Sequence, residues 1–151
     1  MNPVSYDLDG MAQVRWTGLE TMAKPKILCV DDDEVVLLAA QAVLGNRYDI
    51  QIANNGETGL ELMESYRPDW VVVDYQMPGM DGARFMLSAK MMGLKAGFIL
   101  LTGLQVGKLD WEGLSPLGLK GHLKKPLEVE RLIEIIEGQK SPWGAPRKDN
   151  P

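Results

Sequence analysis

The stretch that decides the fold is residues 71–82, which read Val-Val-Val-Asp-Tyr-Gln-Met-Pro-Gly-Met-Asp-Gly. Three β-branched residues without polar alternation predict a strand buried on both faces, as strands of parallel sheets are. Asp74 would end this strand, and the following Pro-Gly would turn the chain. Ligands of open α/β sheets bind beyond the carboxyl ends of the strands. Asp74 is therefore a candidate metal ligand, nucleophile or helix cap.

A second apolar strand also ends in acid, because residues 26–33 read Lys-Ile-Leu-Cys-Val-Asp-Asp-Asp. If the two strands are parallel neighbours, Asp31, Asp32 and Asp74 come close together, and these like charges raise each other's pKa. A hard cation such as Mg²⁺ removes this repulsion because it prefers carboxylate oxygens. A plainer interpretation is that Asp32 or Asp33 caps the next helix, but capping does not account for the second strand that ends in acid.

Two further motifs follow, Leu-Thr-Gly at 101–103 and Lys-Lys-Pro at 124–126. With them, residues 24–138 resemble the receiver domain of two-component response regulators, since all four motifs occur in order and each ends a strand. The resemblance implies a flavodoxin-like α/β fold. Its doubly wound parallel sheet would have five strands in the order 2-1-3-4-5, with helices on both faces.

The resemblance also implies roles for the site residues. Asp74 would accept a phosphoryl group as an aspartyl phosphate. Lys125 would pair with that group, Thr102 would donate a hydrogen bond to it, and the Lys125–Pro126 peptide bond would be cis. The cofactor would be Mg²⁺, or Mn²⁺ in its place, with Asp32 binding directly, Asp31 through water, and Asp74 and the backbone carbonyl of Gln76 completing the set.

Each of these residues has a plainer interpretation. Asp74 would be an unmodified cap, Lys125 a solvated surface lysine and Thr102 an ordinary strand residue. Asp81 and Gly82 are expected to form a turn and a cap without any catalytic role.

The only histidine of the chain is His122, three residues before Lys125. The resemblance places it where the family carries a switch aromatic that moves together with Thr102. The alternative is a half-buried histidine of the sheet without a role. A metal site at His122 is excluded because no second histidine or cysteine ligand lies nearby in the sequence.

Periodicity and turn residues predict the remaining elements. Helix stops are expected at Gly45 and Gly138. The five glycines and Pro116 within 103–121 predict a fourth helix that is short or frayed. Strands are expected at 26–31, 48–53, 69–74, 97–101 and 119–123, and the other helices at 33–45, 57–66, 82–94 and 126–137.

The first of these helices is unusually apolar, because Gln41 is the only polar residue between Val35 and Leu44. A surface helix normally has a polar face. We therefore expect part of this helix to form a docking face for the phosphodonor. The alternatives are that the N-terminal segment or a second copy of the chain covers it, which leaves a homodimer open. The positions concerned are Val36, Leu37, Leu38, Ala40, Val43 and Leu44.

Composition fits one domain in 151 residues. Residues 1–23 are expected to be a mobile extension, with a docking helix as the alternative, and residues 139–151 a disordered tail. The net charge of −5 argues against a nucleic-acid partner. The single Cys29 predicts a reducing, cytoplasmic location, and no apolar run reaches the roughly 18 residues of a membrane span.

The expected function is that of a stand-alone phosphoacceptor served by a histidine kinase or a histidine phosphotransfer protein. It would signal through phosphorylation-dependent contact with another protein, and its only reactions would be Mg²⁺-dependent self-phosphorylation and slow autodephosphorylation. The alternative is an interaction module with the same fold and no phosphorylation. A missing acid, threonine or lysine would favour that alternative, and none is missing. A dehalogenase-like phosphatase would have Asp-x-Asp where Asp74-Tyr75-Gln76 stands.

Overall fold

The computed structural model describes residues 24–103 and 109–139. The extension expected at 1–23 lies outside these residues, and so do residues 104–108 and 140–151. Gln139, which we expected in the tail, instead ends the last helix.

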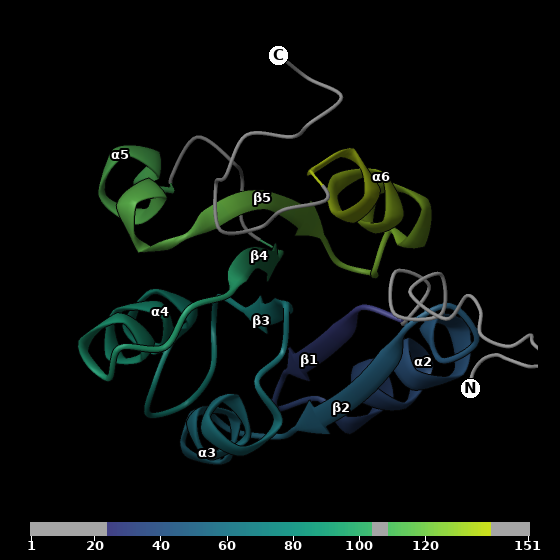
Figure 1. The fold of residues 1–151 in the computed structure, drawn as a ribbon, viewed down its shortest axis with the longest axis horizontal. Helices are drawn as coiled ribbons and strands as arrows, with labels where there is room; N and C mark the ends of the chain where they lie inside the picture. The colour runs from purple at the N-terminus through teal and green to yellow at the C-terminus, as the bar shows by residue number, and fades with distance from the viewer. Residues whose placement is uncertain (1–23, 104–108, 140–151) are drawn as a thin grey trace, which may run out of the picture.

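Five parallel strands form one sheet in the order β2-β1-β3-β4-β5, which confirms the predicted fold (Figure 1). The central strands β3 and β4 are buried along their whole length, because they have a neighbour on each side and helices on each face. The strands are β1 (Lys26–Val30), β2 (Asp49–Ala53), β3 (Trp70–Asp74), β4 (Gly97–Thr102) and β5 (Leu119–Lys124).

Helices cover both faces of the sheet (Figure 1). Val72 of β3 packs in the cluster beneath α2 and α6, whereas Val71 and Val73 pack in the cluster beneath α3, α4 and α5. The uninterrupted valine run therefore serves two cores, as predicted. The helices are α2 (Glu34–Leu44), α3 (Gly56–Tyr66), α4 (Gly82–Met91), α5 (Trp111–Leu114), the 3-10 turn η2 (Ser115–Leu117) and α6 (Val129–Gln139). None of the helices in the described part of the chain is long and apolar enough to cross a membrane.

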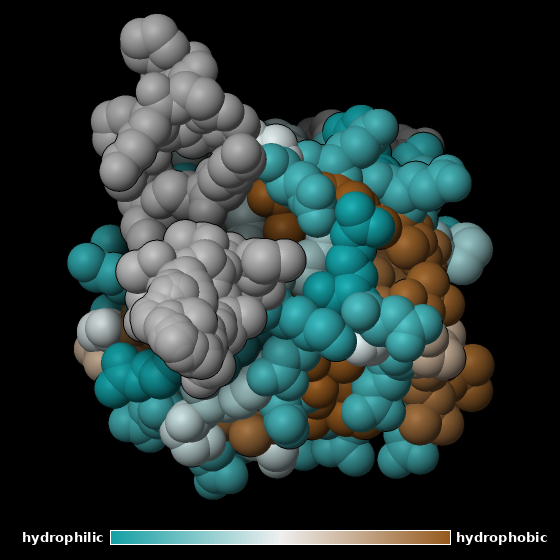
Figure 2. All heavy atoms as spheres, turned by 45° about the vertical axis from the view of Figure 1, so that its right-hand side comes forward, coloured by the Kyte–Doolittle hydropathy of each residue, from teal (hydrophilic) through white to brown (hydrophobic). Residues whose placement is uncertain are grey.

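The outer face of α2 exposes apolar side chains, as expected. Leu37, Ala40 and Leu44 are buried against the sheet, while Val35, Leu38 and Val43 are 75%, 60% and 53% exposed. Figure 2 brings this side of the molecule forward and shows apolar side chains gathered in patches between hydrophilic ones. The three turns of α2 therefore bury one apolar face and present another to solvent.

Several helix boundaries differ from the predictions. Gly45 follows α2 with a right-handed φ of −64°, so the prediction of a left-handed glycine at this position was wrong. A glycine is nevertheless useful there, because a Cβ would stand only 2.7 Å from Gln41 O. Left-handed residues follow other helices instead: Arg67 after α3 has φ of 56°, and Gly93, with φ of 77°, lies beyond the end of α4 at Met91.

The last helix also differs from the prediction at both ends. It begins at Val129 and not at Pro126, and the Leu132 N–H bonds back to Glu128 O at 3.0 Å. It then continues through Gly138, so the predicted stop at that glycine was wrong. The region after β4 does contain the predicted short helix, the four-residue α5.

Candidate functional site

Three buried polar side chains lie together at the carboxyl edge of the sheet. Asp31 directly follows β1, Asp74 ends β3, and Thr102 ends β4. Their exposed fractions are 2%, 3% and 1%. Because the three strands are parallel neighbours, their carboxyl ends bring residues from distant parts of the chain to one place, as the sequence predicted.

The predicted acid cluster is present. Asp31, Asp32 and Asp74 each place one carboxylate oxygen so that all three lie within 4.8 Å of one another. Asp33 takes the capping role, because its side chain accepts the Val35 N–H at 2.9 Å. The Asp33 N–H in turn donates to Asp31 Oδ1 at 2.9 Å. Because Asp33 serves as the helix cap, the exposed Asp32 carboxylate is the second acid of this run that joins the cluster.

Both oxygens of Asp74 are held in place. Oδ1 accepts the backbone N–H of Gln76 at 3.1 Å, and Oδ2 accepts a hydrogen bond from Lys125 Nζ at 2.9 Å. The same ammonium lies 3.3 Å from Asp31 Oδ2. The single Lys125 ammonium therefore faces two buried carboxylates, and the site as a whole stays negatively charged.

Lys125 is positioned by the end of β5. Its backbone N–H donates to Thr102 O at 3.1 Å, and its peptide bond to Pro126 is cis, as the resemblance implied. Burial lowers the pKa of Lys125, but the hydrogen bond and charge of Asp74, together with Asp31, outweigh burial and raise that pKa. The ammonium is therefore charged at any physiological pH.

Asp31 is the member of the cluster whose ionisation is disfavoured. Burial, with the charge of Asp74, raises its pKa to about 6 against the lowering effects of the Asp33 N–H and Lys125. Its Oδ2 accepts no hydrogen bond from any described residue. A buried carboxylate oxygen that forms an ion pair with Lys125 but no well-aligned hydrogen bond, beside two further carboxylates, fits a hard divalent cation with oxygen ligands. Cys29 does not contribute, because burial and the nearby Asp31 raise its thiol pKa to about 12.

The loop after Asp74 is fixed by a close backbone approach. The Gly82 N–H donates to Tyr75 O at 2.8 Å, and a Cβ on Gly82 would stand 2.9 Å from Asp74 O. Asp81 caps α4 by accepting the Arg84 N–H at 2.8 Å, as predicted. Gly82 therefore does more than the predicted turn and cap, because its backbone lies against the strand; the Pro-Gly-Met-Asp-Gly run at 78–82 is the sequence signal for this close approach.

The two switch candidates lie on neighbouring strands. Thr102 is buried at the end of β4, and His122 is half-buried on β5. The His122 ring stands edge-on to Trp111 of α5, with ring centroids 5.1 Å apart and planes at 67°. Sequence reasoning did not single out Trp111, because no spacing pattern links it to His122.

Comparison with known proteins agrees with this geometry. Residues 27–137 match the family of the response regulator receiver domain. The response regulator MprA of Mycobacterium leprae is 32% identical over 112 residues, which are 74% of this chain and 49% of that protein. The chain thus spans about half the length of this relative. Sporulation initiation phosphotransferase F of Bacillus subtilis is 29% identical over 118 residues, 77% of this chain and 94% of that protein.

Solved structures show the same fold. The signal receiver domain of an HD domain-containing protein from Pseudomonas fluorescens matches with a TM-score of 0.68 and 28% identity, covering 76% of this chain and 93% of that one. The chemotaxis protein CheY4 of Vibrio cholerae matches with a TM-score of 0.67 and 24% identity, covering 77% and 98%.

Proposed function

The chain belongs to the response regulator receiver family, and from this premise we propose that Asp74 accepts a phosphoryl group from the phosphohistidine of a histidine kinase or a histidine phosphotransfer protein. The observation that carries the proposal is the environment of Asp74. It is a buried carboxylate at a strand end, hydrogen-bonded to Lys125 and clustered with two further acids.

The chemistry asks the protein mainly for positioning and for positive charge. A carboxylate oxygen of Asp74 attacks phosphorus, the new O–P bond forms, and the electron pair of the P–N bond leaves with the donor imidazole. The Gln76 N–H and Lys125 hold Asp74 in one orientation before the attack. After the transfer, the Lys125 ammonium pairs with the negatively charged phosphoryl oxygens, and the Thr102 hydroxyl donates a hydrogen bond to one of them.

Asp31, Asp32, Asp74 and the backbone carbonyl of Gln76 are the proposed ligands of Mg²⁺, or of Mn²⁺ in its place. Such a cation supplies charge against the transferring phosphoryl group. The fit rests on the three clustered carboxylate oxygens and on the buried Asp31 oxygen, which accepts no hydrogen bond from a described residue and has only the Lys125 ion pair. Because the pKa of Asp31 is raised to about 6, its carboxylate becomes increasingly protonated as the pH falls below this value, so the site should bind cations better at neutral pH than at acidic pH.

We place donor docking on the outer face of α2. This helix starts directly after the acid cluster, and its cap residue Asp33 also holds Asp31. The exposed Val35, Leu38 and Val43 form an apolar surface of the kind that marks partner sites. A donor seated there would lie beside Asp74.

The output face lies on the other side of the site. Phosphorylation adds roughly −1.5 to −2 charge at Asp74, which draws the Thr102 hydroxyl toward the new oxygens. His122 then moves into the space beside β4 and leaves its edge contact with Trp111. The short α5, with Gly113 inside it, has little intrinsic helix stability to oppose this shift.

Intact-mass measurement after incubation with a small phosphodonor and Mg²⁺ tests the proposal. We expect the mass of one phosphoryl group on the wild type and none on Asp74→Asn. The matched control is Asp81→Asn, which keeps a capping side chain on α4 and should be phosphorylated normally. Phosphorylation that persists in Asp74→Asn would refute the assignment, and a chain that binds Mg²⁺ but takes up no phosphoryl group would favour an interaction module instead.

A further inference from the structure

A hollow of about 400 Å³ lies at the amino edge of the sheet, opposite the acid cluster. It is formed where α4 ends, where the chain turns into β4, and where η2 leads into β5. The six residues of β4, at about 3.3 Å each, separate this hollow from Thr102 by roughly 20 Å. The hollow is therefore distinct from the proposed phosphoacceptor site.

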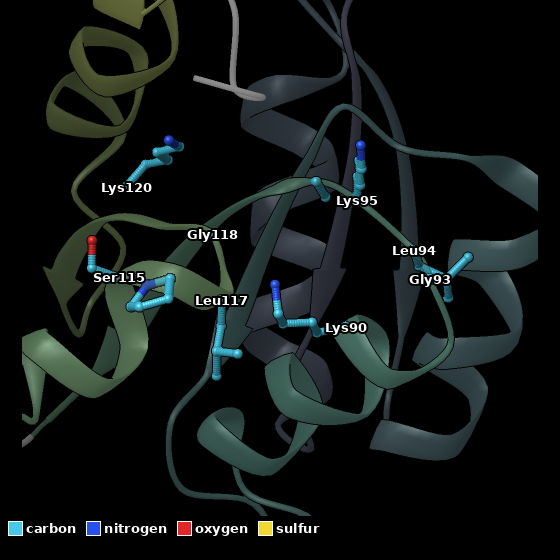
Figure 3. A pocket seen from close by; sticks show the side chains of 10 residues that line it. Lys90, Gly93, Leu94, Lys95, Ser115, Leu117, Gly118 and Lys120 are labelled. Carbon is cyan, nitrogen blue, oxygen red and sulfur yellow. The ribbon is translucent and has the colours of Figure 1, made fainter. Parts of the chain in front are cut away.

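Three lysines surround this hollow, although the chain as a whole carries a net charge of −5. Lys90 comes from the end of α4, Lys95 from the turn before β4, and Lys120 from β5 (Figure 3). None of the described residues that line the hollow is acidic. Within the described ranges, none of the three ammonium groups takes part in an ion pair or a hydrogen bond.

The position of Lys120 depends on an irregularity of the sheet. Phe98 and Ile99 of β4 pair with Leu119 and Gly121 of β5, so Lys120 is an extra residue on the edge strand. Such bulges re-aim a side chain and often lie next to binding sites. Lys120 is half-buried as a result, whereas Lys90 and Lys95 are exposed.

The remaining lining restricts the ligand. Leu94 and Leu117 give the hollow an apolar wall, and the Ser115 hydroxyl adds a hydrogen-bond donor. No aromatic side chain is among the described lining residues, so a nucleobase would find no stacking partner. No arginine is among them either, and arginine is the side chain that binds planar carboxylates in a bidentate way. Lysines bind phosphate as point charges.

We propose that this hollow is a binding site for a compact phosphorylated anion with at least two negative charges, such as a polyphosphate or a small aliphatic phosphate ester. Its volume suits a small ligand. A ligand there would link α4 to η2 and β5 through Lys90, Lys95 and Lys120. The inference does not depend on phosphorylation of Asp74.

Titration of the full chain with inorganic pyrophosphate in EDTA tests the proposal, with binding followed by calorimetry and by backbone amide NMR shifts. We expect shifts at residues 93–96 and 117–120 but none at 74–76. The affinity should fall with rising salt, because the lysines are partly exposed. Citrate, which carries comparable charge on planar carboxylates, should bind at least several-fold more weakly.

The decisive variant is the triple Lys→Gln substitution at 90, 95 and 120, which should weaken pyrophosphate binding by at least about tenfold. Its matched control removes three exposed cations outside the hollow, by Lys24→Gln, Arg84→Gln and Arg131→Gln. The control and Asp74→Asn should both bind pyrophosphate as the wild type does. Absent binding, an undiminished affinity in the lysine triple variant, an equal loss in the control, or citrate binding of equal strength would each overturn the proposal.

Discussion

Replacing Asp31 by asparagine should stabilise the protein when no divalent cation is present. The Asp31 carboxylate is 2% exposed, and burial with the charge of Asp74 raises its pKa from 3.8 to about 6. Between these two values the folded chain holds a proton that the unfolded chain has lost, so this residue makes stability fall as the pH rises through that window. Above a pH of about 6 the penalty is complete.

The size of this penalty follows from the pKa. A rise of the Asp31 pKa from 3.8 to about 6 lowers the free energy of unfolding by about 3 kcal/mol at neutral pH, since a shift of one pKa unit is worth roughly 1.4 kcal/mol. Asparagine keeps the oxygen that accepts the Asp33 N–H but gives up the attraction of Lys125. We therefore expect a gain of about 1 to 3 kcal/mol, or roughly 4 to 10 °C in Tm.

Urea denaturation in EDTA at several pH values between 4 and 8 measures the effect. The gain should be near zero at the lowest pH and reach its full size by neutral pH. Asp33→Asn is the matched control, because its carboxylate is exposed and asparagine also caps helices well; its stability should stay unchanged. A gain for Asp31→Asn that is absent at neutral pH, or equal at every pH, would refute the reasoning.

Four further outcomes are expected. Asp32→Ala should weaken Mg²⁺ binding by about tenfold in calorimetry while the fold persists, since one of three clustered oxygens is lost; undiminished affinity would remove Asp32 from the ligand set. Leu38→Glu should slow transfer from a phosphohistidine donor by about tenfold but leave phosphorylation by a small donor unchanged, because Leu38 is 60% exposed on α2; equal slowing of both would argue against docking there. Gly82→Ala should cost about 1 to 3 kcal/mol in urea denaturation because its Cβ meets Asp74 O, and a neutral effect would show that the loop relaxes freely. Hydrogen exchange at residues 109–123 should change when Asp74 carries a phosphoryl mimic, and a change confined to residues 74–82 would place the switch elsewhere.

The fold and the centre of the site could be predicted because they rest on local patterns. The valine run of β3 has no polar face, so it had to be buried on both sides, and acids at the ends of two neighbouring strands had to meet. The helix ends depended on the backbone conformation instead. Gly45 stays right-handed and has room for Gln41 O, four residues earlier, and the residue type alone does not predict that conformation.

The basic hollow was not predictable for a related reason. Lys90, Lys95 and Lys120 come from three elements, and the bulge that places Lys120 exists only in the pairing of β4 with β5. The contact between His122 and Trp111 likewise arises from the packing of α5 on an edge strand. Pattern reasoning therefore found the groups that strand ends bring together and missed those that irregular segments position.

Asp33 joins two parts of the molecule through one residue. Its N–H holds Asp31 in the acid cluster, and its carboxylate holds the first turn of α2. A donor protein that shifted the start of α2 would therefore also shift Asp31, one of the proposed cation ligands. Thermodynamic linkage makes this coupling reciprocal. If a bound cation raises the affinity for the donor by some factor, the bound donor raises the affinity for the cation by the same factor. Donor affinities measured with and without Mg²⁺ would consequently report the strength of this single-residue connection.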